Sequence, residues 1–206
     1  MFTGIVQSMG KVVSVERRDG VLRVRLEANG WNAAARRGDS IAVDGVCLTL
    51  IDDAATDLNF DVVEQTLSLT TLGALRAGDQ VHLEAAVTAA TPLGGHLVQG
   101  HVDGVGSVLQ AERAADSARL RIGIPGAIAS TMVPQGSVCV SGVSLTVAAC
   151  GEQENTAWFE VALIPETIQR TWLGALQRGA RVNIETDYLA KLVARMVDRA
   201  LANRQR

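Results

Sequence analysis

The stretch SIAVDGVCLTL, residues Ser40 to Leu50, returns 97 positions later as SVCVSGVSLTV, residues Ser137 to Val147. In each copy two short apolar runs flank a pair of turn-forming residues, Asp44-Gly45 in the first and Ser141-Gly142 in the second. Asp-Gly between apolar runs is a strong signal for a two-residue hairpin turn, and Ser-Gly is a weaker form of it. The chain is therefore predicted to form the same β-hairpin twice.

Two further blocks repeat in the same order. The block GIVQSMGKV from Gly4 matches GHVDGVGSV from Gly100 at an offset of 96, and TLSLTTLGALRAGDQVHLE from Thr66 matches TIQRTWLGALQRGARVNIE from Thr167 at an offset of 101. The offset grows only between blocks, as expected when loops gain residues and strands do not. Three collinear blocks indicate a duplicated domain of about 95 residues. We predict two domains, 1–96 and 97–187, followed by a separate segment, 188–206.

Each copy has the pattern of a β-domain. Val21–Glu27 and Arg119–Ile124 alternate apolar and polar residues, as half-buried strands do. Glycines recur at short intervals between the apolar runs, which favours a small closed barrel, because closure leaves no free strand edge. Short helical pieces are predicted at Asn29–Arg37, Thr70–Gly78 and Pro125–Val133. The predicted fold class is all-β, with two tandem barrels that arise from an internal duplication.

The last segment has a different period. Apolar residues recur at three- and four-residue steps at Leu189, Leu192, Val193, Met196, Val197, Ala200 and Leu201. This pattern predicts a C-terminal amphipathic α-helix of about 16 residues. Its apolar stripe needs a partner, and the pattern leaves two open: the rest of the same chain or a second subunit.

Composition narrows the class of protein. The 206 residues carry a net charge of −3 and 3% aromatics, which is a poor match for a nucleic-acid-binding surface. No apolar run reaches membrane-spanning length and the N-terminus lacks a signal-peptide pattern, so we expect a soluble, cytoplasmic protein without membrane contact. The three cysteines form no CxxC pair, and His96 and His101 lack a further ligand, so no metal site is predicted. Dinucleotide, P-loop and nucleophile-elbow motifs are absent from the sequence.

Polar residues that recur at matching positions are the candidate site residues. Residues two apart on a strand point to the same face, so Cys47 and Thr49 share one face in the first copy. Ser144 and Thr146 share the matching face in the second copy. A thiol or hydroxyl beside a threonine hydroxyl can hydrogen-bond a planar heterocycle, although repeated threonines also suit strands in general. The matched pairs are Ser40/Ser137, Cys47/Ser144, Thr49/Thr146 and Thr66/Thr167.

Five motifs carry a resemblance to a known family. MFTGIV, GVCLTL, GGHLVQGHVDG, GVSLTV and LIPETIQRTWLG together resemble riboflavin synthase over essentially the whole chain. The resemblance implies two six-stranded Greek-key barrels, each binding one 6,7-dimethyl-8-ribityllumazine, and a homotrimer held by the C-terminal helix. The active site would lie where the first barrel of one subunit faces the second barrel of another. Whether the protein also assembles with a lumazine synthase is left open.

The same resemblance implies a reaction without a metal or redox cofactor. One lumazine passes a four-carbon unit to a second, which gives riboflavin and 5-amino-6-(D-ribitylamino)uracil. The 7-methyl group of the lumazine is acidic enough for a modest base to start this dismutation. Two similar sites for two identical molecules would then explain why the motifs occur twice, since holding both reactants in place supplies much of the acceleration.

Motif matching assigns the site residues. In the first barrel they would be Gly4, Ile5, Val6, Ser40, Cys47, Leu48, Thr49, Asp61, Val62, Val63, Glu64, Gln65 and Thr66, with Phe2 stacked near the ring. In the second barrel they would be Gly100, His101, Val102, Gln135, Ser144, Leu145, Thr146, Ala162, Leu163, Ile164, Pro165, Glu166, Thr167 and Asp187. The resemblance implies that proton transfer and adduct formation take place closest to Cys47, Ser40, Thr49 and His101. The chain departs from the usual family pattern at Glu64-Gln65 and at Ser141.

Two other functions fit parts of the sequence. A non-catalytic lumazine- or flavin-binding protein would keep the barrels without the reaction, but GVSLTV and LIPET in the second copy favour the enzyme. A tandem barrel for single-stranded nucleic acid would need aromatic platforms and a basic groove, which this composition lacks.

Overall fold

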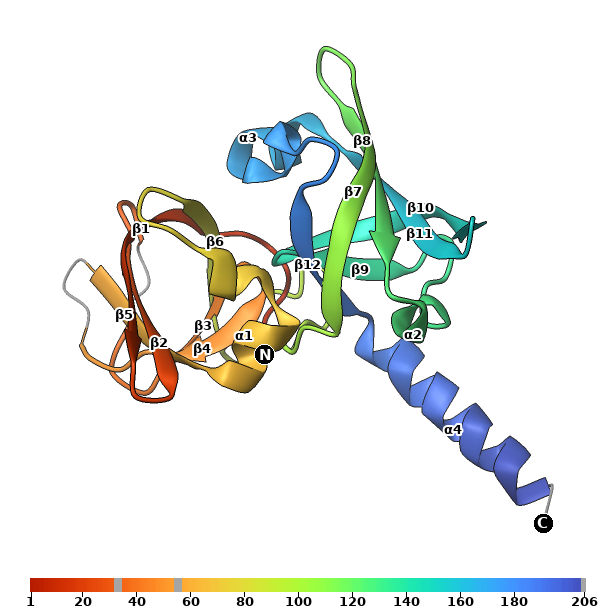
Figure 1. Cartoon of the computed structure of the whole chain (residues 1–206), viewed down its shortest axis with the longest axis horizontal. Coiled ribbons are helices and arrows are strands. Elements are labelled where there is room, and N and C mark those ends of the chain that lie inside the picture. The colour runs from red at the N-terminus through yellow and green to blue at the C-terminus, as the bar shows by residue number, and fades with distance from the viewer. Residues whose placement is uncertain (32–34, 54–56, 205–206) are drawn as a thin grey trace.

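A computed structural model describes residues 1–31, 35–53 and 57–204, and it has two β-domains followed by one long helix (Figure 1). The first domain contains β1 (Ser8–Arg18), β2 (Val21–Glu27), β3 (Ser40–Val43), β4 (Val46–Thr49), β5 (Asp57–Val63), α1 (Glu64–Leu69), the 3-10 helix η1 (Thr71–Ala74) and β6 (Gln80–Ala85). The second contains β7 (Gly104–Arg113), β8 (Ala118–Ile124), α2 (Gly126–Ala129), β9 (Ser137–Val140), β10 (Val143–Gln153), β11 (Thr156–Leu163), α3 (Pro165–Arg170), η2 (Trp172–Ala175) and β12 (Arg181–Thr186). The helix α4 spans Tyr188–Arg204. The predicted domain boundary at 96/97 falls in the connection between β6 and β7.

The two sheets have the same strand order. The second sheet is a closed six-stranded barrel, β10-β11-β8-β7-β12-β9. The first follows the matching order β4-β3-β6-β1-β2-β5, and its two ends meet through an isolated bridge between Leu50 and Phe60. All strand pairs are antiparallel. The predicted all-β duplication is confirmed, with a continuous ladder around the second barrel and a single bridge closing the first.

The repeated hairpin has the predicted turn in both copies. Asp44 and Gly45 have φ values of 45° and 76°, and Ser141 and Gly142 have values of 44° and 86°. Positive φ at both central residues defines the type I′ turn that matches the twist of the flanking strands. The helical pieces predicted within Pro125–Val133 and Thr70–Gly78 correspond to α2 and η1, whereas the piece predicted at 29–37 includes residues outside the described part of the chain.

Each barrel has its own aliphatic core around one buried phenylalanine, Phe60 in the first and Phe159 in the second. A third, smaller cluster fills the space between the barrels: Phe2, Ala42, Val98 and Cys139. Phe2 is fully buried there and its backbone N–H donates to the carbonyl of Val98 at 2.7 Å. The expectation that Phe2 stacks on a ligand ring is therefore wrong for this chain, because its ring is part of the inter-barrel core.

Polar side chains join the barrels at the tips of the two hairpins. The ring Nδ1–H of His82 donates to the carbonyl of Ser141 at 2.7 Å, and the Asn183 side-chain amide donates to the carbonyl of Asp44 at 2.9 Å. His82 and Asn183 occupy matching places in the repeat, 101 residues apart. Trp172 donates its indole N–H to the Asp44 carboxylate at 3.1 Å. Burial raises the pKa of Asp44 to about 7 and lowers the pKa of His82 to about 4.

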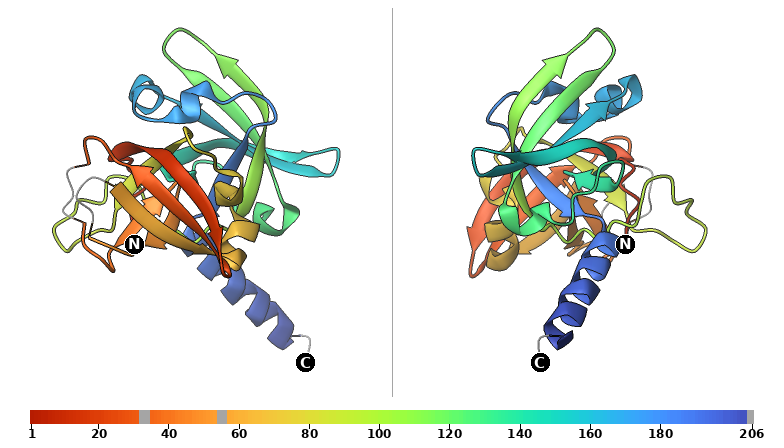
Figure 2. Two further views of the ribbon diagram at one scale, coloured as in Figure 1. Left: turned by 60° about the vertical axis from the view of Figure 1, so that its left-hand side comes forward. Right: turned by 90° about the vertical axis from the view of Figure 1, so that its right-hand side faces the viewer.

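The helix α4 projects away from both barrels (Figures 1 and 2). Its predicted apolar stripe is largely exposed, with Leu189 58%, Val193 61% and Met196 66% accessible. Of the two partners that the pattern left open, the chain's own barrels therefore do not cover the stripe. No helix in the described residues is long and apolar enough to cross a membrane.

Candidate functional site

Each barrel receives the opening segment of the other repeat. The carbonyl of Gly4 accepts a hydrogen bond from the backbone N–H of Ser144 at 2.7 Å, and the carbonyl of Gly100 accepts one from Cys47 N–H at 2.9 Å. Val6 packs against the core of the second barrel, and Val102 packs against the core of the first. We call Thr3–Val6 and Gln99–Val102 the exchanged segments.

This exchange corrects the predicted grouping of the site residues. Motif matching assigned Gly4, Ile5 and Val6 to the site of Cys47, and Gly100, His101 and Val102 to the site of Ser144. The backbone contacts pair them the other way. The repeat alone identified two equivalent segments, but it carried no information on which barrel each segment contacts.

The contact between segment and hairpin requires glycine. A Cβ on Gly4 would lie 2.7 Å from the Cβ of Ser144, and one on Gly100 would lie 2.6 Å from the Cβ of Cys47. Both glycines also have positive φ, 75° and 79°. The two glycines thus let the backbone lie directly against the candidate site residue of each barrel.

Two buried glutamates hold the exchanged segments. The Glu84 carboxylate accepts from the N–H of Thr3 at 2.6 Å and of Gly4 at 3.0 Å. The Glu185 carboxylate accepts from the N–H of Gln99 at 2.7 Å and of Gly100 at 2.9 Å. Burial raises the pKa of both carboxyls, and these hydrogen bonds partly offset that effect. The sequence analysis did not identify Glu84 and Glu185 as site residues. A glutamate near the end of the last strand in both copies is the pattern that could have indicated them.

The second-barrel site contains a hydroxyl–imidazole pair. Ser144 Oγ lies 2.7 Å from His96 Nδ1, and His96 is 8% exposed. Burial lowers the pKa of His96, and the negative charge of Asp187 acts in the opposite direction. Sequence reasoning considered His96 only as a metal ligand, because 48 residues separate it from Ser144.

In the first-barrel site, Cys47 is half-buried on β4 and Thr49 is exposed two residues further on. Thr49 pairs in register with Ser40 on β3, which brings these two hydroxyl-bearing residues together. His101 is exposed and follows Gly100, whose carbonyl contacts Cys47. The four residues expected closest to the chemistry therefore lie on or beside one hairpin.

The helices α1 and α3 begin within the last predicted segments, 61–66 and 162–167. The carbonyls of Thr66 and Thr167 accept hydrogen bonds from the hydroxyls of Thr70 and Thr171 at 2.7 and 2.6 Å. The Thr66 and Thr167 side chains are half-exposed. The two segments thus have the same local geometry in both barrels.

Several predicted residues have side chains that a ligand cannot reach. Leu48, Val62, Leu145 and Leu163 are buried in the barrel cores, so only their backbone groups are available.

Asp61 is held by Arg23 through two hydrogen bonds of 2.8 and 2.7 Å, and the pair lowers the pKa of Asp61. Glu64 and Glu166 form exposed ion pairs with Arg17 and Arg170. The remaining predicted residues with exposed side chains are Ile5, Val63, Gln65, Gln135, Thr146, Ala162, Ile164 and Pro165.

Gln135 has a backbone conformation that glycine would adopt more easily. Its φ is 64°, and its N–H donates to the carbonyl of Val147 at 2.8 Å. The matching position in the first repeat is Gly38, with φ of 93° and an N–H that donates to Leu50. The glutamine side chain at this position of the second barrel therefore requires a backbone conformation that costs free energy for any residue except glycine.

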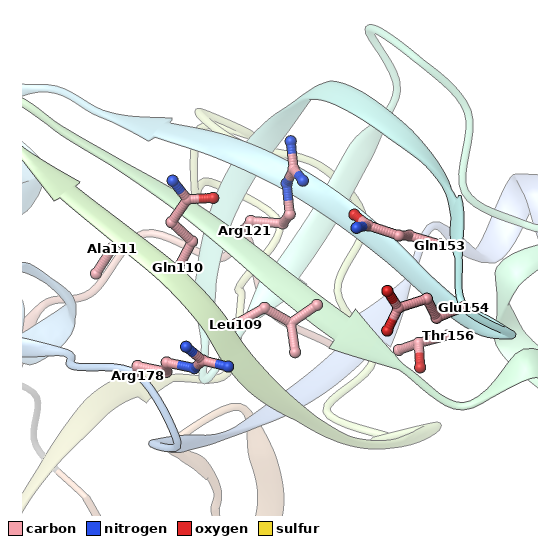
Figure 3. Close-up of a pocket in the computed structure, with 8 residues that line it drawn as sticks. All are labelled: Leu109, Gln110, Ala111, Arg121, Gln153, Glu154, Thr156 and Arg178. Atoms are coloured by element: carbon pink, nitrogen blue, oxygen red, sulfur yellow. The ribbon is translucent and has the colours of Figure 1, made fainter.

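One described cavity lies away from the candidate site residues. A cavity of about 670 Å³ lies on the wall of the second barrel, where Leu109, Arg121 and Arg178 face it (Figure 3). None of the residues that line it belongs to the predicted lumazine sites. The predicted ligand residues with exposed side chains lie outside this cavity.

Comparison with known proteins supports the same two units. The family model of the lumazine binding domain matches residues 3–86 and 99–187. The riboflavin synthase of Mycobacterium tuberculosis (strain ATCC 25618 / H37Rv) is 43% identical, over 96% of this chain and 98% of its own length. That of Bacillus subtilis (strain 168) is 33% identical, over 99% of this chain and 93% of its own length.

Solved structures share the fold. The structure of LumP with riboflavin has a TM-score of 0.77 at 25% identity, covering 90% of this chain and 99% of that chain. The structure of LumP with 6,7-dimethyl-8-(1'-D-ribityl) lumazine has a TM-score of 0.75 at 23% identity, with the same coverage. With two matched lumazine-binding units and relatives that align over nearly their whole length, this chain belongs to the riboflavin synthase family.

Proposed function

We propose that the protein is a riboflavin synthase, a transferase that converts two molecules of 6,7-dimethyl-8-ribityllumazine into riboflavin and 5-amino-6-(D-ribitylamino)uracil. The observation that carries this proposal is the matched pair of contacts of Gly4 with Ser144 and of Gly100 with Cys47. One chain thereby has two similar sites, as a reaction between two identical molecules requires. Relatives named riboflavin synthase support the same activity.

Each site combines residues of both repeats. The first-barrel site comprises Ser40, Cys47 and Thr49 with the segment of Gly100 to Val102, and Thr66 contacts the ribityl chain. The second-barrel site comprises Ser144 and Thr146 with the segment of Gly4 to Val6, together with Gln135 and Thr167. Backbone groups of the exchanged segments and hairpins bind the pyrimidinedione edge, which explains why several assigned side chains can be buried.

The active site is completed between subunits. Candidate side chains of both barrels, among them Thr49, His101 and Thr146, are exposed in the single chain, so a second subunit is needed to bring the two lumazines face to face and to exclude water. The exposed stripe of α4, with Val193 and Met196 at its centre, supports a homotrimer assembled through this helix. Reaction in the cytoplasm without a cofactor is part of the same proposal.

The second candidate is a non-catalytic carrier of lumazine or flavin. It is favoured by one observation, namely that structures of LumP bound to lumazine or riboflavin share this fold. The enzyme is preferred because riboflavin synthases align with this chain at up to 43% identity, well above the 25% of LumP.

The test is to mix the purified protein with 6,7-dimethyl-8-ribityllumazine alone and to follow lumazine loss and riboflavin formation by absorbance. The expected result is two lumazines consumed for each riboflavin formed, with sharply slower turnover in Cys47→Ser and His101→Gln. Tight binding with no riboflavin would reject the enzyme and leave the carrier.

A further inference from the structure

The junction between the barrels is built from matching residues, but one of its two sides carries an extra oxygen atom. In the first repeat, the N–H of His82 donates to Asp44 Oδ1 at 2.8 Å. In the second repeat, the N–H of Asn183 donates to Ser141 Oγ at 3.1 Å. Asp44 and Ser141 hold the same position of the repeated hairpin turn. One acceptor oxygen is therefore enough at this position, and the junction does not need the second carboxylate oxygen of Asp44.

This second oxygen, Asp44 Oδ2, accepts no hydrogen bond from the described part of the chain. The N–H of His82 and the indole N–H of Trp172 both donate to Oδ1. Oδ2 is also not among the fully inaccessible side-chain atoms of the described residues that lack a partner, so solvent reaches it. The Asp44 side chain is only 5% exposed. Because the oxygens of a carboxyl group buried to this extent are normally hydrogen-bonded, Oδ2 is an acceptor available to a ligand.

A cavity of about 500 Å³ lies against this carboxyl group, between the two barrels. The first barrel contributes Asp44, Leu75 and Asp79 to its lining, and the second contributes Trp172 and Arg181. Trp172 is a second departure from the symmetry of the repeat, because Thr71 holds the matching position in the first copy. The carboxyl group and the indole that distinguish this side of the junction therefore line the same cavity.

The charges around the cavity favour a cation. Asp79 is exposed, and its Oδ2 accepts from the N–H of Arg76 at 2.8 Å, while its Oδ1 has no hydrogen bond within the described residues. Arg181 is exposed and forms no ion pair with any described residue. An anion would meet the open oxygen of Asp44 at the inner end of the cavity, whereas a cation can donate a hydrogen bond to it.

We propose that this cavity binds a small organic cation in which a planar apolar group carries an amidinium or guanidinium. The cationic group donates a hydrogen bond to Asp44 Oδ2, and the planar group packs against Trp172 and Leu75. A forked N–H donor suits a carboxylate, and an aromatic surface attracts both flat rings and cations. None of the residues that line this cavity belongs to the predicted lumazine sites, so the site is separate from the proposed activity.

The ionisation of Asp44 makes binding depend on pH. Burial raises the pKa of Asp44 to about 7 in the protein without a ligand. The groups beside it are Asp79, Arg181 and His82, whose Nδ1 lies 3.6 Å from Asp44 Oδ1. Burial lowers the pKa of His82 to about 4, so this ring is neutral near pH 7. A cation binds the ionised carboxylate better than the neutral acid, and its affinity therefore rises as the pH rises through 7.

The first experiment titrates the whole protein with benzamidine by isothermal titration calorimetry at about pH 8. A ligand of this size is expected to bind with a dissociation constant of about 10 mM or lower. Benzamide has the same shape without the charge and is expected to bind at least about 10-fold more weakly. Benzamidine affinity should also fall between about pH 8 and pH 6. No binding of benzamidine, or equal binding of the two compounds, would overturn the proposal.

Asp44→Ser is the variant that removes the open oxygen and retains the junction. It copies Ser141, whose Oγ accepts the N–H of Asn183 at the matching position. We expect lumazine binding at the wild-type level, which checks that both barrels are folded, and benzamidine binding at least about 10-fold weaker. The pH dependence of benzamidine binding should disappear in this variant. Unchanged benzamidine affinity would overturn the role of Asp44 and with it the proposed site.

Two variants at the rim test the same site without changing the junction. Asp79→Asn keeps an acceptor for the N–H of Arg76 and should weaken benzamidine binding about two- to five-fold, whereas Arg181→Ala should strengthen it by a similar factor. Asp39→Asn is the matched control, because Asp39 accepts the N–H of Arg36 in the same way at 2.8 Å but lies outside the cavity. Equal effects of Asp79→Asn and Asp39→Asn, or weaker binding in Arg181→Ala, would contradict a cation in this cavity.

Discussion

The backbone N–H of Trp172 donates a hydrogen bond to Nε2 of His82 at 3.1 Å, and the two rings stack with centroids 4.7 Å apart. Because Nε2 accepts this bond, while Nδ1–H donates to the carbonyl of Ser141, His82 is a neutral imidazole of fixed tautomer. Asn183 makes the matching contacts from the second barrel to the first. Its Oδ1 accepts from the N–H of Thr71 at 2.8 Å, and its side-chain amide donates to the carbonyl of Asp44. His82 thus serves as an asparagine analogue at the junction of the barrels.

Replacement His82→Asn should change how stability depends on pH. The pKa of His82 is about 4 in the folded protein and about 6.5 in the unfolded chain, so between these values only the unfolded chain binds the proton. The stability contributed by this residue is therefore present above pH 6.5 and is lost as pH falls towards 4. In His82→Asn this loss should be absent. Urea unfolding of both proteins at several pH values from 4.5 to 7 measures the difference. For one proton, the free energy of unfolding changes by about 1 kcal/mol per pH unit in this range. Equal pH dependence of the two proteins would contradict the neutral His82.

Replacement Asp44→Asn should have the opposite effect. The pKa of Asp44 is raised from 3.8 to about 7, so the folded protein retains a proton that the unfolded chain has lost. Its contribution is present below pH 3.8 and is lost as pH rises through 7. In the wild-type protein this trend opposes that of His82 between pH 4 and 6.5. Asp44→Asn should therefore become more stable with rising pH in that interval, relative to wild type, by urea unfolding. A variant that parallels the wild-type curve would argue against the raised pKa.

The glutamates that hold the exchanged segments should act on opposite barrels. In Glu84→Gln an amide group replaces one carboxylate oxygen, so one N–H of Thr3 or Gly4 loses its acceptor, at a cost of about 1–3 kcal/mol. Hydrogen–deuterium exchange should then accelerate at the amide of Ser144 and remain unchanged at Cys47. Glu185→Gln should accelerate exchange at Cys47 and leave Ser144 unchanged. Each variant is the control of the other, and equal effects on both hairpins would contradict the exchanged arrangement.

Gln135→Gly should increase stability and decrease ligand binding. Glycine relieves the positive φ of 64°, which is expected to raise the free energy of unfolding by about 1 kcal/mol. If the side chain contacts lumazine, the affinity of the second-barrel site should fall by several-fold, as measured by fluorescence titration. Gly38→Gln is the reciprocal control and should destabilise the first barrel by a similar amount. Unchanged lumazine affinity in Gln135→Gly would remove this residue from the site.

A charged substitution in the stripe of α4 should dissociate the proposed homotrimer without unfolding the chain. Val193 and Met196 are 61% and 66% exposed in the single chain, so Val193→Glu with Met196→Glu removes little packing within it. Sedimentation velocity should show a monomer in place of the trimer, and riboflavin formation should fall with it. Arg195→Glu, on the polar side of the helix, should leave the assembly intact. A trimer that survives the double substitution would exclude α4 as the assembly element.

The strands and turns were predictable because they depend on local patterns. Val21–Glu27 alternates apolar and polar residues and forms β2 with those bounds, and the Asp44-Gly45 turn has the backbone conformation that its sequence favours. The duplication then fixed the fold class, since the same strand order occurs in both sheets. The exposure of the α4 stripe was open at this level, because a periodic pattern identifies a face but not its partner.

The sequence by itself determined that there are two equivalent hairpins, two equivalent glycine segments and a set of matched polar residues. Only the tertiary structure decided that Gly4 contacts Ser144 and that Gly100 contacts Cys47, because two repeats with matching motifs fit either pairing equally well as sequences. The carboxylates of Glu84 and Glu185 select one pairing through hydrogen bonds between residues 80 or more positions apart. The same holds for His96 and Ser144, whose contact depends on the route of a linker past a glycine and not on any local pattern.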